Sequence, residues 1–213
     1  MEFLKYFIDL FLHLDKHLDF FVSNYGVLTY LILFLIIFAE TGLVVTPFLP
    51  GDSLLFAAGA LAARGGLDVY LLIVLLLIAA ILGDGVNYLV GKYLGPKVFA
   101  RDYRLLKKEY LLTTQEFYEK HGGKAIILAR FVPIVRTFAP FIAGVGSMNY
   151  SRFVIYNVIG AVIWVVSLVT LGYFVGEIPF VKKNLSVVAL GIVFISVLPI
   201  IIQGILASRK STN

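Results

Sequence analysis

Five charged side chains stand in otherwise apolar stretches of the sequence, where a charge is costly. An isolated charge at the centre of a bilayer costs about 2.5–3.5 kcal/mol on insertion scales. Such residues usually pair with one another, face a wet cavity or bind a substrate. Three carboxylates together with two guanidinium groups predict a polar site for an anionic group. The five residues are Glu40, Asp52, Asp84, Arg130 and Arg136.

The chemistry of these groups suggests different tasks. Arginine binds phosphate through paired N–H donors and keeps its charge when buried, so we expect Arg130 and Arg136 to bind the substrate. Carboxylates in the same surroundings can exchange protons, and we assign proton coupling to Glu40, Asp52 and Asp84. The alternative is a lattice of ion pairs that only holds helices together. The sequence does not show which acid would face which arginine.

The overall composition places these charges in a membrane protein. The chain has 213 residues, of which 60% are hydrophobic and 15% charged, and its mean hydropathy is +0.95. Soluble domains are about 45–50% apolar and about 25% charged, so lipid is the expected solvent. Many of the basic residues lie between Lys92 and Lys124. We interpret this segment as a cytoplasmic loop that follows the positive-inside rule, not as a nucleic-acid surface.

Other kinds of site are disfavoured. The chain has no cysteine, which excludes disulfides and thiolate metal ligands. Its three histidines lie outside the apolar stretches, and no Ser/His/Asp or Cys/His set is visible. We therefore expect no metal, no cofactor and no enzymatic activity. Whether the chain forms a homo-oligomer stays open.

The apolar stretches differ in length and continuity. Only residues 153–176 and 184–208 are uninterrupted and exceed the roughly 20 residues needed to cross a bilayer. The others are interrupted by proline, glycine or charge, and the stretch 69–83 runs into Asp84. Broken segments are tolerated at membrane depth only when buried in protein or lining a wet cavity. Residues 1–25 have one apolar helical face, which predicts an amphipathic helix at the membrane surface or packed against the membrane domain.

Two of the broken segments resemble each other. A phenylalanine, an apolar residue and a proline begin each run, and alanine followed by glycine ends it. A later Gly-x-x-x-Gly pattern also occurs twice. The near-constant offset favours an internal repeat. The paired positions are Pro50 with Pro133, Gly59 with Gly144 and Gly91 with Gly172, at offsets of 83, 85 and 81 residues.

The positive-inside rule then orients the two repeats oppositely, as in many transporters. We expect a single all-α membrane domain with cytoplasmic termini, whose two inverted repeats each carry a re-entrant helical hairpin. Pro50, Gly51, Pro133 and Pro140 would mark the hairpin turns. The expected parts are the amphipathic helix 1–25, repeat 27–95 with hairpin 46–62, basic loop 96–124, repeat 125–176 with hairpin 125–146, and transmembrane helix 184–208.

Long motifs surround the charged residues. The segment Phe38–Gly42 is followed by PFLPGDSLLFAAGALA, and further on come GDGVNYLVGKYLG and FYEKHGGKAIILARFVPIVRTFAPFIAGVGSMNYSRF. These stretches are similar to the first-hairpin, central and second-hairpin motifs of the DedA family, also called the VTT or SNARE-associated Golgi superfamily. The resemblance covers about residues 1–207 and looks close to bacterial members.

The resemblance implies a multi-pass inner-membrane protein with two re-entrant hairpins, linked to proton-dependent transport. It also implies that the family's essential acids correspond to Glu40 and Asp52, and its essential arginines to Arg130 and Arg136. Members are implicated in moving undecaprenyl phosphate or phospholipids, so a proton-coupled lipid flippase whose partners are lipid headgroups and protons is expected. The alternatives are a proton-coupled antiporter of small cations or drugs, and an assembly factor without transport.

Overall fold

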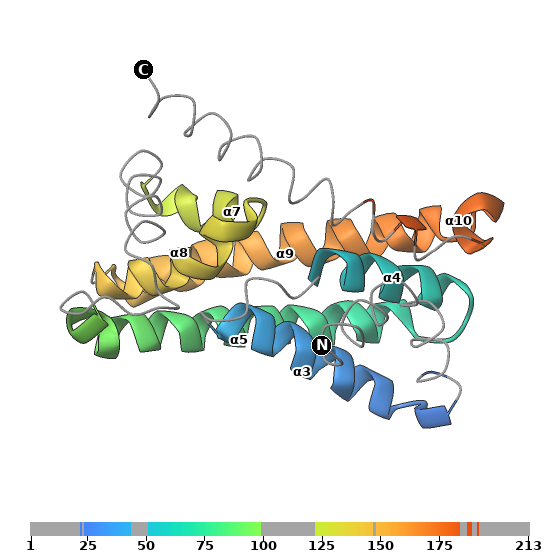
Figure 1. The fold of residues 1–213 in the computed structure, drawn as a ribbon, viewed down its shortest axis with the longest axis horizontal. Coiled ribbons are helices and arrows are strands. Elements are labelled where there is room, and N and C mark those ends of the chain that lie inside the picture. Colours follow the sequence, from blue (N-terminus) through green and yellow to red (C-terminus); the bar gives the residue numbers. More distant parts are fainter. Residues whose placement is uncertain are drawn as a thin grey trace, which may run out of the picture. The chain divides into compact units, whose positions relative to one another are not determined.

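The computed structural model describes residues 22, 24–43, 51–98, 122–146, 148–183, 187–188 and 191 (Figure 1). Throughout these ranges the regular elements are helices, as the sequence predicts. In chain order they are α3 (Leu28–Gly42), α4 (Gly51–Ala63), α5 (Val69–Val98), the short 3-10 helix η1 (Gly122–Lys124), α7 (Ala125–Ala129), α8 (Pro133–Val145), α9 (Tyr150–Val175) and α10 (Pro179–Lys183).

Two of the described helices are long and apolar enough to cross a membrane, Val69–Leu94 and Tyr150–Val175. The second agrees with the predicted span 153–176. The first corrects the sequence interpretation, because α5 continues without a break through Asp84 to Val98. Aspartate is only a moderately poor helix former and does not end a helix by itself, and Arg130 binds its buried carboxylate.

The middle of the long helix α5 buries its polar residues and exposes apolar ones. On α5, Asp84 and Asn87 are buried, whereas side chains of the opposite face are 40–71% exposed. A soluble helix shows the reverse arrangement, and ionisable residues of membrane helices face the protein interior. This pattern is therefore that of a helix surrounded by lipid. The exposed side chains are Ile78, Leu82, Val86, Leu89 and Tyr93.

The chain divides into two compact units, each drawn from three stretches of sequence. Unit 1 comprises residues 1–36, 50–77 and 165–195, and unit 2 comprises 37–49, 78–164 and 196–213. Of the described elements, unit 1 therefore contains α4 and α10 with parts of α3, α5 and α9. Unit 2 contains η1, α7 and α8 with the remaining parts of those three helices.

In unit 1, α4 packs on the end of α9 at very short range. A Cβ atom added at Gly59 would lie 2.2 Å from the backbone oxygen of Val169, and one added at Gly172 would lie 2.0 Å from the oxygen of Phe56. Real Cβ atoms do not approach backbone so closely, and glycine is needed at both positions. The glycine pairs found in the sequence thus allow two helices to touch backbone to backbone.

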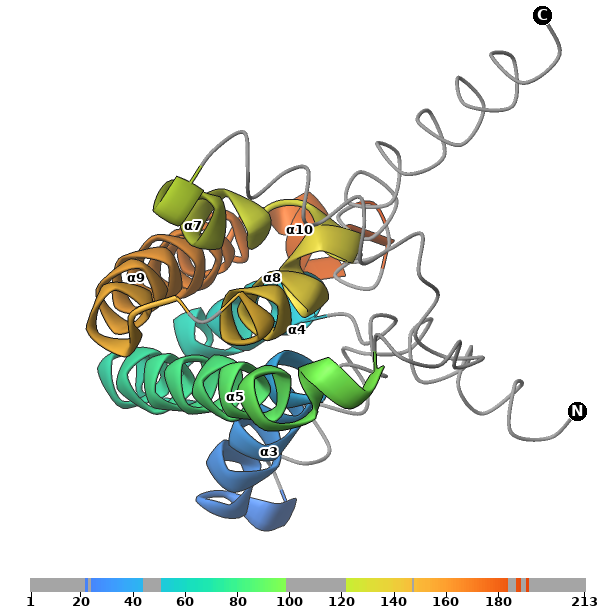
Figure 2. The same ribbon diagram turned by 90° about the vertical axis from the view of Figure 1, so that its left-hand side faces the viewer.

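In unit 2, α7 and α8 pack against each other and are joined by residues 130–132 (Figure 2). Pro133 is the first residue of α8, and the residue before it has the extended conformation that proline imposes. Pro140 does not mark a turn, contrary to the sequence prediction, because it lies inside α8. Proline is tolerated inside membrane helices where neighbouring groups bind the freed backbone.

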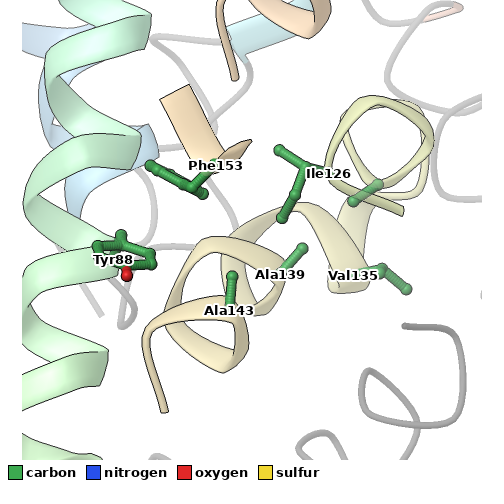
Figure 3. Packing of buried hydrophobic residues seen from close by; sticks show 7 residues of the cluster. Tyr88, Ile126, Val135, Ala139, Ala143 and Phe153 are labelled. Atoms are coloured by element: carbon green, nitrogen blue, oxygen red, sulfur yellow. The ribbon is translucent and has the colours of Figure 1, made fainter. Parts of the chain in front are cut away.

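A small apolar core surrounds α8 in unit 2. Figure 3 shows Tyr88 of α5 beside Phe153 of α9, with Ala139 and Ala143 on α8. The rings of Tyr88 and Phe153 stack with their centroids 4.5 Å apart. The small residues of α8 permit this helix to approach α5 closely. The other members of the core are Ile126, Ala129 and Val135.

Several predicted features lie outside the described residues. These are nearly all of the amphipathic helix 1–25, Pro50 with the first limb of hairpin 46–62, most of the basic loop 96–124 and nearly all of the transmembrane helix 184–208. Gly51, the other residue predicted at the first turn, begins α4.

Candidate functional site

The end of α3 lies directly against the middle of α5. A Cβ atom added at Gly83 would lie 1.9 Å from Thr41 Oγ1, and one added at Gly42 would lie 3.3 Å from Gly83 Cα. A side chain at position 83 would therefore clash with Thr41 and with the backbone oxygen of Phe38, and one at position 42 would be tightly packed against Gly83. Glu40 precedes Thr41, and Asp84 follows Gly83. This contact therefore brings two acidic residues of unit 2, one on α3 and one on α5, into adjacent turns of the two helices.

Arg130 lies in the turn after α7 and makes the more buried of two ion pairs. Its Nη2 atom is 2.6 Å from Asp84 Oδ2, and the two side chains are 5% and 6% exposed. The same nitrogen donates to Asn157 Oδ1 of α9 at 2.6 Å. Gly160 makes room for the side chain, since a Cβ atom there would lie 3.1 Å from Arg130 Cδ. Arg130 is thus held by α5 and α9 together.

Arg136, in α8, makes the second ion pair. Its Nη2 atom is 2.8 Å from Glu40 Oε1, and the side chains are 11% and 4% exposed. Arg136 is thus the most exposed member of the four. We refer to Glu40, Asp84, Arg130 and Arg136 as the charge cluster, whose members all belong to unit 2.

Trp164 of α9 lies beside both arginines. Its ring centroid is 4.5 Å from Cζ of Arg136 and 5.7 Å from Cζ of Arg130, which is the range of cation–π attraction. Neither Trp164 nor Asn157 is among the functional residues expected from the sequence. A signal existed for Asn157, because an amide within a 26-residue apolar helix needs a buried partner.

The cluster pairs two carboxylates with two guanidinium groups, so its formal charges cancel. The sequence left the partners open, and the structure pairs Glu40 with Arg136 and Asp84 with Arg130. Asp52 lies in the first turn of α4, in unit 1. The cluster offers an anion two guanidinium groups beside one indole ring, and each guanidinium already binds an oxygen anion. In the described part of the chain, no group of three or more His, Asp and Glu side chains is suited to a metal ion.

Comparison with known proteins identifies the family. Residues 49–174 match the VTT domain. The chain is 55% identical to "Protein DedA" of Escherichia coli K12 over 216 residues, covering 100% of this chain and 99% of that protein. It is 44% identical to an uncharacterized membrane protein of Mycobacterium leprae over 78% of this chain and 75% of that protein.

A further relative is the inner membrane protein YqjA of E. coli K12, at 39% identity over 72% of this chain and 70% of that protein. No solved structure matches. The matched domain includes Asp52, Asp84, Arg130 and Arg136, and the full-length similarity extends to Glu40. The apolar outer faces, the buried charges and these relatives agree, and the chain belongs to the DedA family of VTT-domain membrane proteins.

Proposed function

We propose that this protein is a lipid transporter that moves a phosphate-bearing lipid across the cytoplasmic membrane, with protons coupled to the movement. The substrate class is undecaprenyl phosphate or a phospholipid. The observation that carries the proposal is the pair of arginines beside Trp164, because two guanidinium groups with polarised donors form a strong binding site for phosphate.

In this mechanism the phosphate exchanges with a carboxylate. Phosphate oxygens replace Glu40 on Arg136, the more exposed arginine, while Arg130 adds a second positive charge. The released carboxylate binds a proton, which keeps the buried charges balanced, and loss of that proton restores the ion pair after the lipid leaves. The lipid tail stays in the bilayer along apolar helix faces. Asp84 and Asp52 are further proton carriers in this proposal.

The inverted repeat and its two re-entrant hairpins are part of the proposal. The packing of α7 on α8 supports a hairpin in the second repeat. The matching close contacts at Gly59 with Gly172 and at Gly144 with Gly91 support the repeat. We propose a multi-pass inner-membrane arrangement with both termini in the cytoplasm, which places the two hairpins on opposite sides of the bilayer.

A translocation assay tests the function. Full-length protein is reconstituted in liposomes with a headgroup-labelled phospholipid, and the outward-facing label is quenched over time. We expect Arg136→Gln and Arg130→Gln to slow translocation at least about tenfold, as loss of a buried charged hydrogen bond of about 1.5–3 kcal/mol predicts. Arg152→Gln is the matched control, because this arginine is exposed near the start of α9. Unchanged rates in both buried-arginine variants would overturn the proposal.

The same liposomes separate the alternatives. Competition by unlabelled undecaprenyl phosphate, with none from its uncharged alcohol, identifies the phosphate as the recognised group. An antiporter of small cations instead collapses a pH gradient when the cation is added without any phosphate lipid. An assembly factor predicts full rescue by the exchanged pair Glu40→Arg with Arg136→Glu, because only the ion pair would matter. A phosphate site would be disrupted by that exchange.

A further inference from the structure

Asn87 is a buried amide residue next to the charge cluster. It lies on α5 one turn after Asp84 and is fully buried. Its side-chain amide has two N–H hydrogens, and its nitrogen donates to two backbone oxygens. These are the carbonyl of Thr41, at 3.2 Å, and the carbonyl of Thr137, at 2.8 Å.

The two acceptors are the residues that follow the members of one ion pair. Thr41 comes directly after Glu40, and Thr137 directly after Arg136. One amide therefore connects the backbone beside the acid, at the end of α3, to the backbone beside the base, in α8. The Glu40–Arg136 distance of 2.8 Å depends on the separation of these two backbones.

Both carbonyls lie where the regular hydrogen bonding of a helix ends or is interrupted. Thr41 is in the last turn of α3, whose final carbonyls have no partner within the helix. Thr137 lies inside α8 in the turn before Pro140, whose missing N–H removes the helical hydrogen bond to the carbonyl of Arg136, the residue before Thr137. Asn87 therefore supplies a donor to Thr41 at the end of α3, where an unpaired buried carbonyl costs about 1–3 kcal/mol, and adds a bond to Thr137 beside the interrupted turn of α8.

The orientation of the amide supports this role. Asn87 Oδ1 is buried and has no hydrogen-bond donor among the residues that the structure describes. The side chain thus leaves its own acceptor unsatisfied while its nitrogen serves two carbonyls. A residue that served only as packing would carry no such cost, and Leu168, at the 81-residue offset of Gly91 and Gly172, occupies the corresponding place on α9.

We propose that Asn87 is a positioning residue that joins the two ion pairs into one unit. Asp84 binds Arg130 directly, while Asn87, one turn further along α5, sets the distance between Glu40 and Arg136 through their backbones. One turn of α5 thereby sets the positions of both arginines. This geometry can be measured without any transported substrate.

A distance measurement tests this proposal on the full chain. Because the protein has no cysteine, spin labels can be attached at Leu43→Cys, just after α3, and Phe131→Cys, just before α8. Both side chains are exposed, at 49% and 53%. We expect Asn87→Ala to shift or broaden the measured distance distribution. Asn149→Ala is the matched control, since in the described part of the chain the side chain of Asn149 accepts bonds from Ser151 and Arg152 at the start of α9.

A second variant keeps the test decisive if Asn87→Ala fails to fold. In Asn87→Asp the carboxyl donates a hydrogen bond only when protonated, so its distance distribution should approach that of the parent as the pH is lowered. The labelled parent is measured at each pH as well, because the carboxylates of Glu40 and Asp84, which face Arg136 and Arg130, also respond to pH. Folding is monitored by helical circular dichroism. Identical distributions in parent, Asn87→Ala and Asn87→Asp at every pH would overturn the proposal.

Discussion

Unit 1 and unit 2 each contain a short helix packed on a long one, and the two contacts can be compared position by position. On the short helix of each unit, a phenylalanine lies three residues before a glycine. The backbone of that phenylalanine contacts a glycine of the long helix. A Cβ atom at any of the four glycines would lie 2.0–2.2 Å from a backbone oxygen. The contact in unit 1 involves Phe56, Gly59, Val169 and Gly172, and the contact in unit 2 involves Phe141, Gly144, Tyr88 and Gly91.

The long helices differ one to two turns before this contact. At the offset of 81 residues that relates Gly91 to Gly172, Asp84 corresponds to Val165 and Asn87 to Leu168. Val165 is completely buried, as an apolar residue in a core should be. Close helix packing therefore needs the glycines but not the charges. The charges of unit 2 are therefore not explained by close helix packing, and the proposed phosphate site would account for them.

The largest expected effect comes from replacing Asp84 of unit 2 by valine, the residue that unit 1 has at the corresponding position. Asp84→Val leaves Arg130 buried without its carboxylate, and we expect a loss of about 3–5 kcal/mol in the free energy of unfolding. Arg130→Met in addition should restore most of the stability, because removing both partners of a buried pair is often neutral. Thermal unfolding in detergent measures both effects. If Asp84→Val were as stable as the parent, the buried charge would not distinguish unit 2 from unit 1.

Val165→Asp is the reciprocal change in unit 1. It places a carboxylate at a completely buried position of α9, and we expect destabilisation of similar size. Comparison with Val165→Ala, which lacks the charge, isolates the electrostatic part in the same unfolding experiment. Equal effects of the two variants would show that loss of volume alone matters at this position.

Changes at the shared glycines should affect both units alike. Gly59→Ala and Gly144→Ala each force two backbones apart, and we expect about 1–3 kcal/mol of destabilisation for each. Gly85→Ala is the control, because nothing lies within 4 Å of a Cβ atom there, and alanine favours a helix by up to about 1 kcal/mol. The midpoint of thermal unfolding should fall for the first two and hold or rise for the control. A strong effect in one unit alone would contradict the matched packing.

Replacing Trp164, the aromatic residue beside the charge cluster, should have a moderate effect that is specific to unit 2. Trp164→Phe keeps an aromatic face but weakens cation–π attraction, and we expect a loss of about 1 kcal/mol. A double-mutant cycle with Arg136→Met should show that the two changes are not additive, because the residues are in contact. Additive unfolding free energies would mean that the indole only fills space.

The smallest effects are expected at the helix starts, which the units again share. Asp68 Oδ1 accepts a hydrogen bond from the N–H of Leu71 at the start of α5, and Asn149 Oδ1 does so from the first turn of α9. Asp68→Ala and Asn149→Ala should each cost about 1 kcal/mol of stability. Translocation rates should stay at the parent level in both. A reduced rate in one variant would give that unit an additional role.

Much of the fold and part of the site follow from the sequence. The apolar composition and the long span around residues 153–176 predict a helical membrane protein, because lipid accepts only segments that satisfy their own backbone. The cost of burying charge marks five residues as members of a polar site, and the structure pairs four of them, Glu40 with Arg136 and Asp84 with Arg130, whereas Asp52 lies on α4 in unit 1. The recurring glycines indicate a repeat in the sequence, and the structure shows that four of them, Gly59, Gly91, Gly144 and Gly172, lie at close helix contacts.

The tertiary structure decided the pairing, the contribution of uncharged residues and the course of two helices. Glu40 binds Arg136 and Asp84 binds Arg130, and the second pair joins residues 46 positions apart. An ion pair forms over a few ångströms, and that distance depends on how several helices pack together. For the same reason the sequence alone does not show that α5 continues past Asp84, whose carboxylate pairs with Arg130 of a distant segment, or that α8 continues past Pro140.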